Sequence, residues 1–115
     1  MIAFALKGER ISCDPAYIQT GIYPKIDPYE PEQFGWRVMS SEGEYLGMAT
    51  VNLADYGDFP DEGCVFVKIT PEFGGWLDSL IAAGFIEATG RILSAGFVKH
   101  YAVECRVLKP ELLKL

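Results

Sequence analysis

The sequence predicts an α+β fold: a mostly antiparallel, curled β-sheet of about five to seven strands, with one helix packed on one face. Several segments alternate apolar and polar residues, which is typical of strands, and one stretch has helical spacing. Half of the 115 residues are hydrophobic, so the chain can bury a core without a metal or a disulfide. We therefore expect a single domain over residues 1–115.

The first expected elements surround a proline-rich stretch. Ile2–Leu6 alternates larger apolar residues with alanine and predicts a strand, to which Arg10–Cys13 pairs back after a turn. Residues 14–33 contain four prolines interleaved with aromatic residues. Because proline interrupts regular structure, we expect an extended loop held against the core by its aromatics, with one short strand around Tyr17–Tyr23.

A hairpin and a central strand are expected next. Residues 34–39 and 45–53 each alternate with a period of two, and Gly43 lies in the turn between them. An acidic loop follows over residues 55–63. Cys64–Ile69 is almost continuously apolar, which indicates a central strand covered on both faces.

The helix has its own start and stop signals. Thr70 can cap it and Pro71 suits its first position, although Gly74 and Gly75 disfavour that turn and leave a start near Gly75 as the alternative. Gly84 lies where a left-handed residue ends a helix. Phe85 can then contact Leu80 in a Schellman arrangement.

The last third of the chain predicts further strands. We expect a short strand over residues 85–88, a turn at 89–91, another short piece at 92–93 and a long strand over 97–108. The odd positions of the long strand, which we expect to face the core, are Phe97, Lys99, Tyr101, Val103, Cys105 and Val107. Pro110 ends pairing, so residues 110–115 are expected to be a frayed tail.

Charge and cysteine content narrow the class of protein. Residues 1–62 hold 11 acidic and 4 basic side chains, whereas residues 63–115 hold 5 and 6. This asymmetry indicates either a negative face for a basic partner or an ordinary solvated surface. An acidic chain is a poor nucleic-acid binder, and no stretch approaches the ~18 apolar residues that a membrane span needs.

Three cysteines without a CxxC pair argue against a disulfide framework and for a reducing compartment. The first residues lack the basic region of a signal peptide, so we expect a cytoplasmic protein. Because small sheets often pair through free edges, a homodimer is one candidate assembly, and the sequence leaves the oligomeric state open.

Three segments resemble a group of small uncharacterised bacterial proteins that phages and plasmids often carry. They are ATVNL at Ala49–Leu53, FVKI at Phe66–Ile69 and LDSLIAAGFIEATGRILSAGFV at Leu77–Val98. The similar proteins show an ATVNL strand, a VFVK-type strand, a helix, an I-E-x-T-G-R turn and a G-F-V strand in that order. The resemblance covers about half of the chain and implies no activity, because these motifs mark structure rather than catalysis.

No catalytic or metal signature stands out. His100 is the only histidine, and Cys105 lies five residues along the same expected strand, where side chains point to the opposite face. Three cysteines and one histidine lie too far apart in sequence for a zinc site. The acidic loop lacks the ligand spacing of a calcium site. We therefore expect no cofactor and no metal.

The sequence thus favours a non-enzymatic protein-interaction or accessory module with an acidic surface for a basic partner, and the resemblance implies a mobile-element origin. The candidate binding residues are Asp55, Tyr56, Asp58, Phe59, Asp61, Glu62, Arg91 and Trp76. The alternative for Arg91 is a turn arginine that binds backbone carbonyls or Glu87.

Two alternative functions stay open. One is a small-molecule or peptide binder with a pocket between helix and sheet, near Trp76 and Tyr101. The other is a small hydrolase that uses Cys64 or Cys105 with His100.

Overall fold

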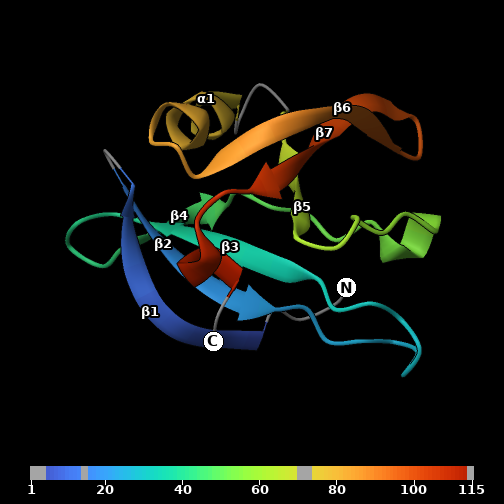
Figure 1. The fold of residues 1–115 in the computed structure, drawn as a ribbon, viewed down its shortest axis with the longest axis horizontal. Helices are drawn as coiled ribbons and strands as arrows, with labels where there is room; N and C mark the ends of the chain where they lie inside the picture. Colours follow the sequence, from blue (N-terminus) through green and yellow to red (C-terminus); the bar gives the residue numbers. More distant parts are fainter. Residues whose placement is uncertain (1–4, 14–15, 70–73, 114–115) are drawn as a thin grey trace.

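The computed structural model describes residues 5–13, 16–69 and 74–113 and confirms an α+β fold. Within these residues, seven strands form two antiparallel sheets beside one α-helix (Figure 1). The first sheet has the order β1 (Ala5–Cys13), β2 (Ala16–Ile22), β3 (Phe34–Met39), β4 (Tyr45–Met48). The second has the order β5 (Cys64–Lys68), β7 (Val98–Val107), β6 (Ile86–Ala95). The remaining elements are η1 (Ala54–Tyr56), α1 (Gly74–Ala82) and η2 (Pro110–Leu113).

The segment after β4 joins the two sheets. The Ala49 N–H donates to the Trp36 carbonyl in the first sheet at 3.0 Å, and the Val51 N–H donates to the Phe66 carbonyl in the second at 3.0 Å. Thr50, between them, pairs with β5 in an antiparallel bridge. The single curled sheet expected from the sequence is therefore divided into two sheets that share this bent segment.

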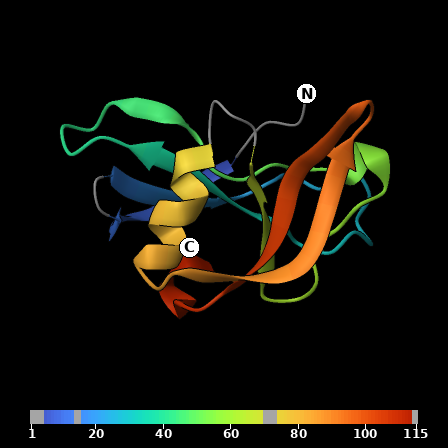
Figure 2. The ribbon, with the colours of Figure 1, turned by 90° about the horizontal axis from the view of Figure 1, so that it is seen from above.

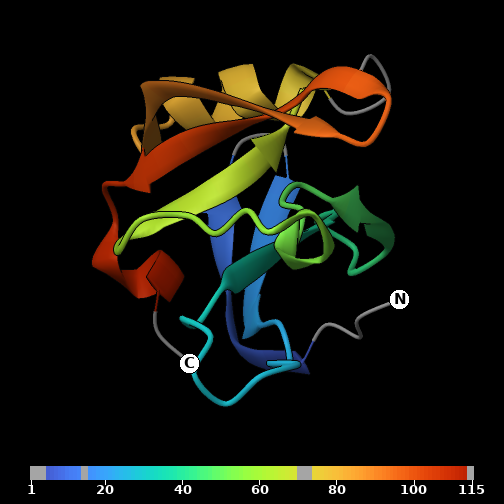
Figure 3. The ribbon, with the colours of Figure 1, turned by 90° about the vertical axis from the view of Figure 1, so that its right-hand side faces the viewer.

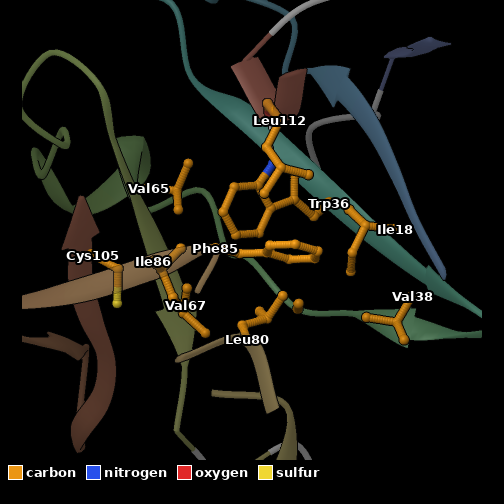
Figure 4. Packing of buried hydrophobic residues seen from close by; sticks show 11 residues of the cluster. Ile18, Trp36, Val38, Val65, Val67, Leu80, Phe85, Ile86, Cys105 and Leu112 are labelled. Atoms are coloured by element: carbon orange, nitrogen blue, oxygen red, sulfur yellow. Dashed lines mark hydrogen bonds between the residues drawn. The ribbon is translucent and has the colours of Figure 1, made fainter. Parts of the chain in front are cut away.

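The main core lies between the first sheet, the inner face of the second sheet and α1. Trp36 is fully buried at its centre, and its Nε1–H donates to the Leu112 carbonyl at 3.1 Å. Figure 4 shows the indole directed toward Leu112 of η2. The buried members of the cluster are Ile18, Trp36, Val38, Ala49, Val65, Val67, Leu80, Phe85, Ile86, Cys105 and Leu112.

The helix ends as predicted. Gly84 has φ 77°, in the left-handed region, and its N–H donates to the Ile81 carbonyl at 3.0 Å. The Phe85 N–H donates to the Leu80 carbonyl at 3.0 Å, which completes the Schellman motif. The predicted cap at Thr70 and Pro71 lies outside the described residues. None of the helices in the described part of the chain is long and apolar enough to cross a membrane.

Three expected local features are wrong. The turns predicted at residues 7–9 and 89–91 are irregularities within the continuous strands β1 and β6. Gly90, with φ 97°, lets β6 continue past the second one. Residues 110–113 of the expected frayed tail form η2, because Leu112 is buried against the core. Within the loop predicted over residues 14–33, the short strand expected around Tyr17–Tyr23 is confirmed as β2.

The expected odd-faced packing of β7 holds only in part. Val103, Cys105 and Val107 pack in the main core, as predicted. Ala102 and Glu104, at even positions, are also buried, because the other face of the sheet is covered. Phe97, predicted to face the core, lies in the β6–β7 turn and is fully exposed.

Truncating the Leu112 side chain tests whether η2 anchors the C-terminal segment to the core beside Trp36. We expect Leu112→Ala to lower the free energy of unfolding by about 2–5 kcal/mol, because it leaves a cavity beside Trp36. Urea denaturation measures the change. Leu108→Ala is the control, since Leu108 is exposed and should change stability by less than about 0.5 kcal/mol. Equal effects of the two substitutions would contradict the anchoring role of η2.

Candidate functional site

The acidic loop, residues 55–63, covers the outer face of the second sheet. Strand β5 sends Val65 and Val67 into the main core, while Phe66 points to the opposite face. There Phe66 packs in a second buried cluster with Leu53, Leu93 and Ala102. Figure 3 shows the loop running beside β5, to which it connects. Leu53 thus starts the loop from a buried position on this outer face.

A buried carboxylate joins the loop to the sheet. Glu104 of β7 is only 2% exposed. Its Oε2 accepts the Asp61 N–H at 3.0 Å and Arg91 Nη1 at 3.1 Å, and its Oε1 accepts the Thr89 hydroxyl at 2.8 Å. Burial alone would raise the pKa of Glu104, but these hydrogen bonds outweigh it and hold that pKa below its usual value. Glu104 is therefore ionised and satisfied at neutral pH.

Arg91 holds a second part of the loop. Its Nη1 also donates to the Phe59 carbonyl at 3.0 Å, and its Nη2 lies 3.7 Å from Asp58 Oδ1. The guanidinium stacks over the Phe66 ring at 5.4 Å. Arg91 thus binds a backbone carbonyl, as the turn-arginine alternative predicted. Its buried carboxylate partner is Glu104 and not Glu87. Glu87, the other carboxylate considered, pairs with Arg106 at 3.4 Å on the surface.

These contacts divide the predicted site residues. Asp58 and half-buried Phe59 are attached to Arg91. Asp55 and Tyr56 are exposed at one end of the loop, and Asp61 and Glu62 are exposed at the other. The structure therefore separates the acidic loop into a fixed centre and two accessible ends.

Trp76 and Tyr101, the residues expected near a pocket between helix and sheet, belong to different clusters. Trp76 of α1 packs against the main core, and Tyr101 packs against the cluster on the outer face. Leu80 and Phe85 occupy the space between α1 and the sheets (Figure 4). The structure therefore does not place Trp76 beside the acidic loop.

A cleft of about 540 Å³ opens at the Asp61–Glu62 end of the loop. Its lining comes from the segment before β3 (Pro31, Glu32 and Phe34), from residues 60–64 and from Leu113, and we call it the acidic cleft. Its charged side chains are Glu32, Asp61 and Glu62, and its apolar ones include Pro31, Phe34 and Pro60. Among the described residues that line the cleft, none is a lysine, an arginine or a histidine. The cleft is thus apolar at its walls and negative at its rim.

Glu32 and Phe34 are the site residues that the sequence reasoning missed. They are distant in sequence from the acidic loop, and Glu32 is one of several acids in the proline-rich stretch. Tyr23 supplies the link, since its N–H donates to the Gln33 carbonyl at 2.9 Å and returns the chain to β3. An excess of acid on both sides of the 34–53 hairpin was the available signal.

Cys64 and Cys105 are weak nucleophiles. Burial raises the pKa of Cys105 to about 12, and burial also raises the pKa of Cys64, which lines the cleft. Both thiols are free and stay protonated at neutral pH, whereas the thiolate is the reactive form. His100 is exposed near the β6–β7 turn, on the same strand as Cys105 and five residues from it.

The fold and the cleft define a small α+β protein with an acidic loop latched onto one face of a sheet. Comparisons with protein-family models, curated proteins and solved structures find no match for the chain. Among residues 5–13, 16–69 and 74–113, no group of three His, Cys, Asp or Glu side chains could hold a metal ion.

The hydrogen bonds of Glu104 with Asp61, Thr89 and Arg91, which we call the Glu104 latch, should make the stability of the protein depend on pH. Because its pKa is lowered in the folded state, Glu104 contributes stability above its unfolded pKa of ~4.3, and this contribution is lost as pH falls through the folded value. We expect Glu104→Gln to be less stable than wild type by about 1–3 kcal/mol at pH 7. The difference should shrink below pH ~4. Urea denaturation at several pH values measures it.

The control for the latch is Glu87→Gln, which removes an exposed ion pair worth about 0–1 kcal/mol. A Glu104→Gln deficit that stays constant from neutral to acid pH would contradict an ionised latch.

Thiol protection gives a second prediction. In a Cys13→Ser/Cys64→Ser background, Cys105 should react with a thiol reagent at pH 8 at least about a hundredfold more slowly in the folded protein than in urea, because burial raises its pKa to about 12 and leaves little thiolate. Stopped-flow absorbance with an aromatic disulfide follows the reaction. Equal rates in the two states would contradict the burial of the Cys105 thiol.

Proposed function

We propose that this protein is a non-enzymatic interaction module that binds a basic segment of a partner in the acidic cleft. The observation that carries the proposal is the cleft itself, whose described lining combines three carboxylates with apolar residues and includes no cation. A cationic side chain entering it meets opposite charge, and its apolar neighbours meet Pro31, Phe34 and Pro60. The mobile-element origin that the resemblance implies belongs to the same proposal.

The fixed loop supports binding over a merely solvated surface. Asp61 is tied through its backbone to Glu104, while its side chain stays exposed at the cleft. Because the latch orders the loop before a partner arrives, binding loses less conformational entropy. The thiols of Cys64 and Cys105 are protonated, and His100 lies near the tip of the β6–β7 hairpin, away from Cys105 on the same strand. Both observations favour binding over nucleophilic catalysis.

A peptide titration tests the proposal. The probes are labelled peptides in which lysines flank one phenylalanine, and matched peptides in which glutamates do. We expect the basic peptide to bind wild type and Asp61→Lys/Glu62→Lys to weaken it about tenfold or more, because attraction becomes repulsion. Raising salt from low ionic strength should weaken wild-type binding, since exposed charges are screened. Fluorescence polarisation measures both effects.

The matched control is Asp55→Lys/Asp78→Lys, which makes the same change in net charge at exposed positions outside the cleft lining. This variant should keep most of the wild-type affinity. Equal loss in both double variants would indicate general charge attraction and overturn the cleft. Absence of binding to any basic peptide would do the same.

A further inference from the structure

The tip of the β6–β7 hairpin, residues 95–98, exposes an unusual apolar surface. Phe97 is completely exposed and Val98 is 51% exposed. Tyr56 of η1 adds to this surface, because Gly96 approaches its ring: a side chain at Gly96 would begin 3.6 Å from Tyr56 Cε1. Single exposed apolar residues are ordinary, but a group at a projecting turn indicates a contact surface. Figure 2 shows the tip beside η1, at the end of the hairpin away from α1.

The backbone holds this tip in a defined and strained shape. Ala95 pairs with Val98, so the turn is tight. His100, two residues on, has φ 54°, in the left-handed region that side chains disfavour. Such strain persists where the surrounding structure imposes it, and it concentrates at functional positions. The tight turn thus projects Phe97, which we call the aromatic knob, from the end of the hairpin.

Basic residues follow the aromatic knob in the sequence. Residues 94–101 contain Lys99 and His100 and no acidic residue, and both side chains are exposed. An exposed phenylalanine next to a lysine is the chemistry that the acidic cleft suits, with its apolar walls and its carboxylates Glu32, Asp61 and Glu62. The volume of about 540 Å³ is in the range of protein ligand sites.

The two complementary surfaces of one molecule cannot meet. Cys64, at the cleft, pairs with Arg106 near the base of the hairpin, whereas the tip begins at Val98. Eight residues of strand separate these positions, or about 26 Å along the sheet. The knob of one copy therefore reaches only the cleft of another.

We propose that the hairpin tip of a second copy occupies the acidic cleft, which makes the protein a reciprocal dimer. Because tip and cleft lie at opposite ends of the same sheet, two antiparallel copies exchange both contacts at once and close with two-fold symmetry. This inference rests on the proposed function of the cleft as a site for a basic segment, and it identifies that segment as Phe97–Lys99 of the same chain.

A charge-swap cycle on the full chain tests the dimer by sedimentation velocity. Lys99→Glu should raise the dimer dissociation constant about tenfold or more, since a glutamate would then face the carboxylates of the cleft. Asp61→Lys/Glu62→Lys should do the same from the other side. The combination of all three substitutions should restore association, because the charges are opposite again. Phe97→Ser should also disrupt the dimer, whereas Ile81→Ser, which replaces an exposed residue of α1, should not.

Three outcomes would overturn the reciprocal dimer. These are a wild-type protein that stays monomeric at millimolar concentration, a dimer that survives both Phe97→Ser and Lys99→Glu, and a combined variant that fails to reassociate while its circular dichroism shows a folded chain. The peptide titration judges the cleft separately. Basic peptides that bind a monomeric wild-type protein would uphold the proposed function while removing the second copy as its partner.

Discussion

The ionised Glu104 side chain, buried on the outer face of the second sheet, is the constraint around which the candidate site is arranged. A buried carboxylate is costly unless donors surround it. Thr89 and Arg91 supply two donors from the same sheet, and the backbone of Asp61 supplies one from the loop. A segment rich in mutually repelling acids thereby lies fixed against the protein. Together with the hydrogen bond from Arg91 to the Phe59 carbonyl, this contact holds the loop side of the acidic cleft in position.

The loop reaches Glu104 because the chain crosses from one sheet to the other at Thr50. The Thr50 Oγ1 accepts the Trp36 N–H at 2.9 Å and forms a hydrogen bond with the Tyr23 hydroxyl at 3.2 Å. Burial raises the pKa of Tyr23 to about 12, so this hydroxyl stays neutral. The Thr50 side chain therefore forms its hydrogen bonds with residues on the side of the first sheet, while the Thr50 backbone pairs with β5. It delivers the following residues to the face opposite the main core.

Local patterns predicted part of the local structure. Alternation identified β3, a continuous apolar run identified β5, and Gly84 with Phe85 identified the helix end, because each signal involves neighbours in sequence. The turns expected within β1 and β6 were wrong, and β5 lies at an edge of its sheet rather than at its centre. The other errors concern contacts over long separations. From its place in the strand pattern Glu104 is expected to face solvent, but the loop around Asp61, 43 residues away, covers it. Leu112 is expected in a frayed tail, but Trp36, 76 residues away, donates a hydrogen bond to its carbonyl. The acidic loop was recognisable from composition, but its partner wall at Glu32 depends on how the chain returns to β3.

The two buried clusters on opposite faces of the second sheet also divide the molecule into parts that can open separately. The cluster around Trp36 contains the larger set of buried side chains, whereas Leu53, Phe66, Leu93 and Ala102 form the smaller one beneath the loop. Detaching the loop exposes only the smaller cluster, so this opening costs less free energy than global unfolding. The Glu104 latch therefore sets the free energy needed to detach the loop. Amide hydrogens of the loop exchange with solvent, and its backbone becomes accessible to proteases, while the Trp36 core remains folded.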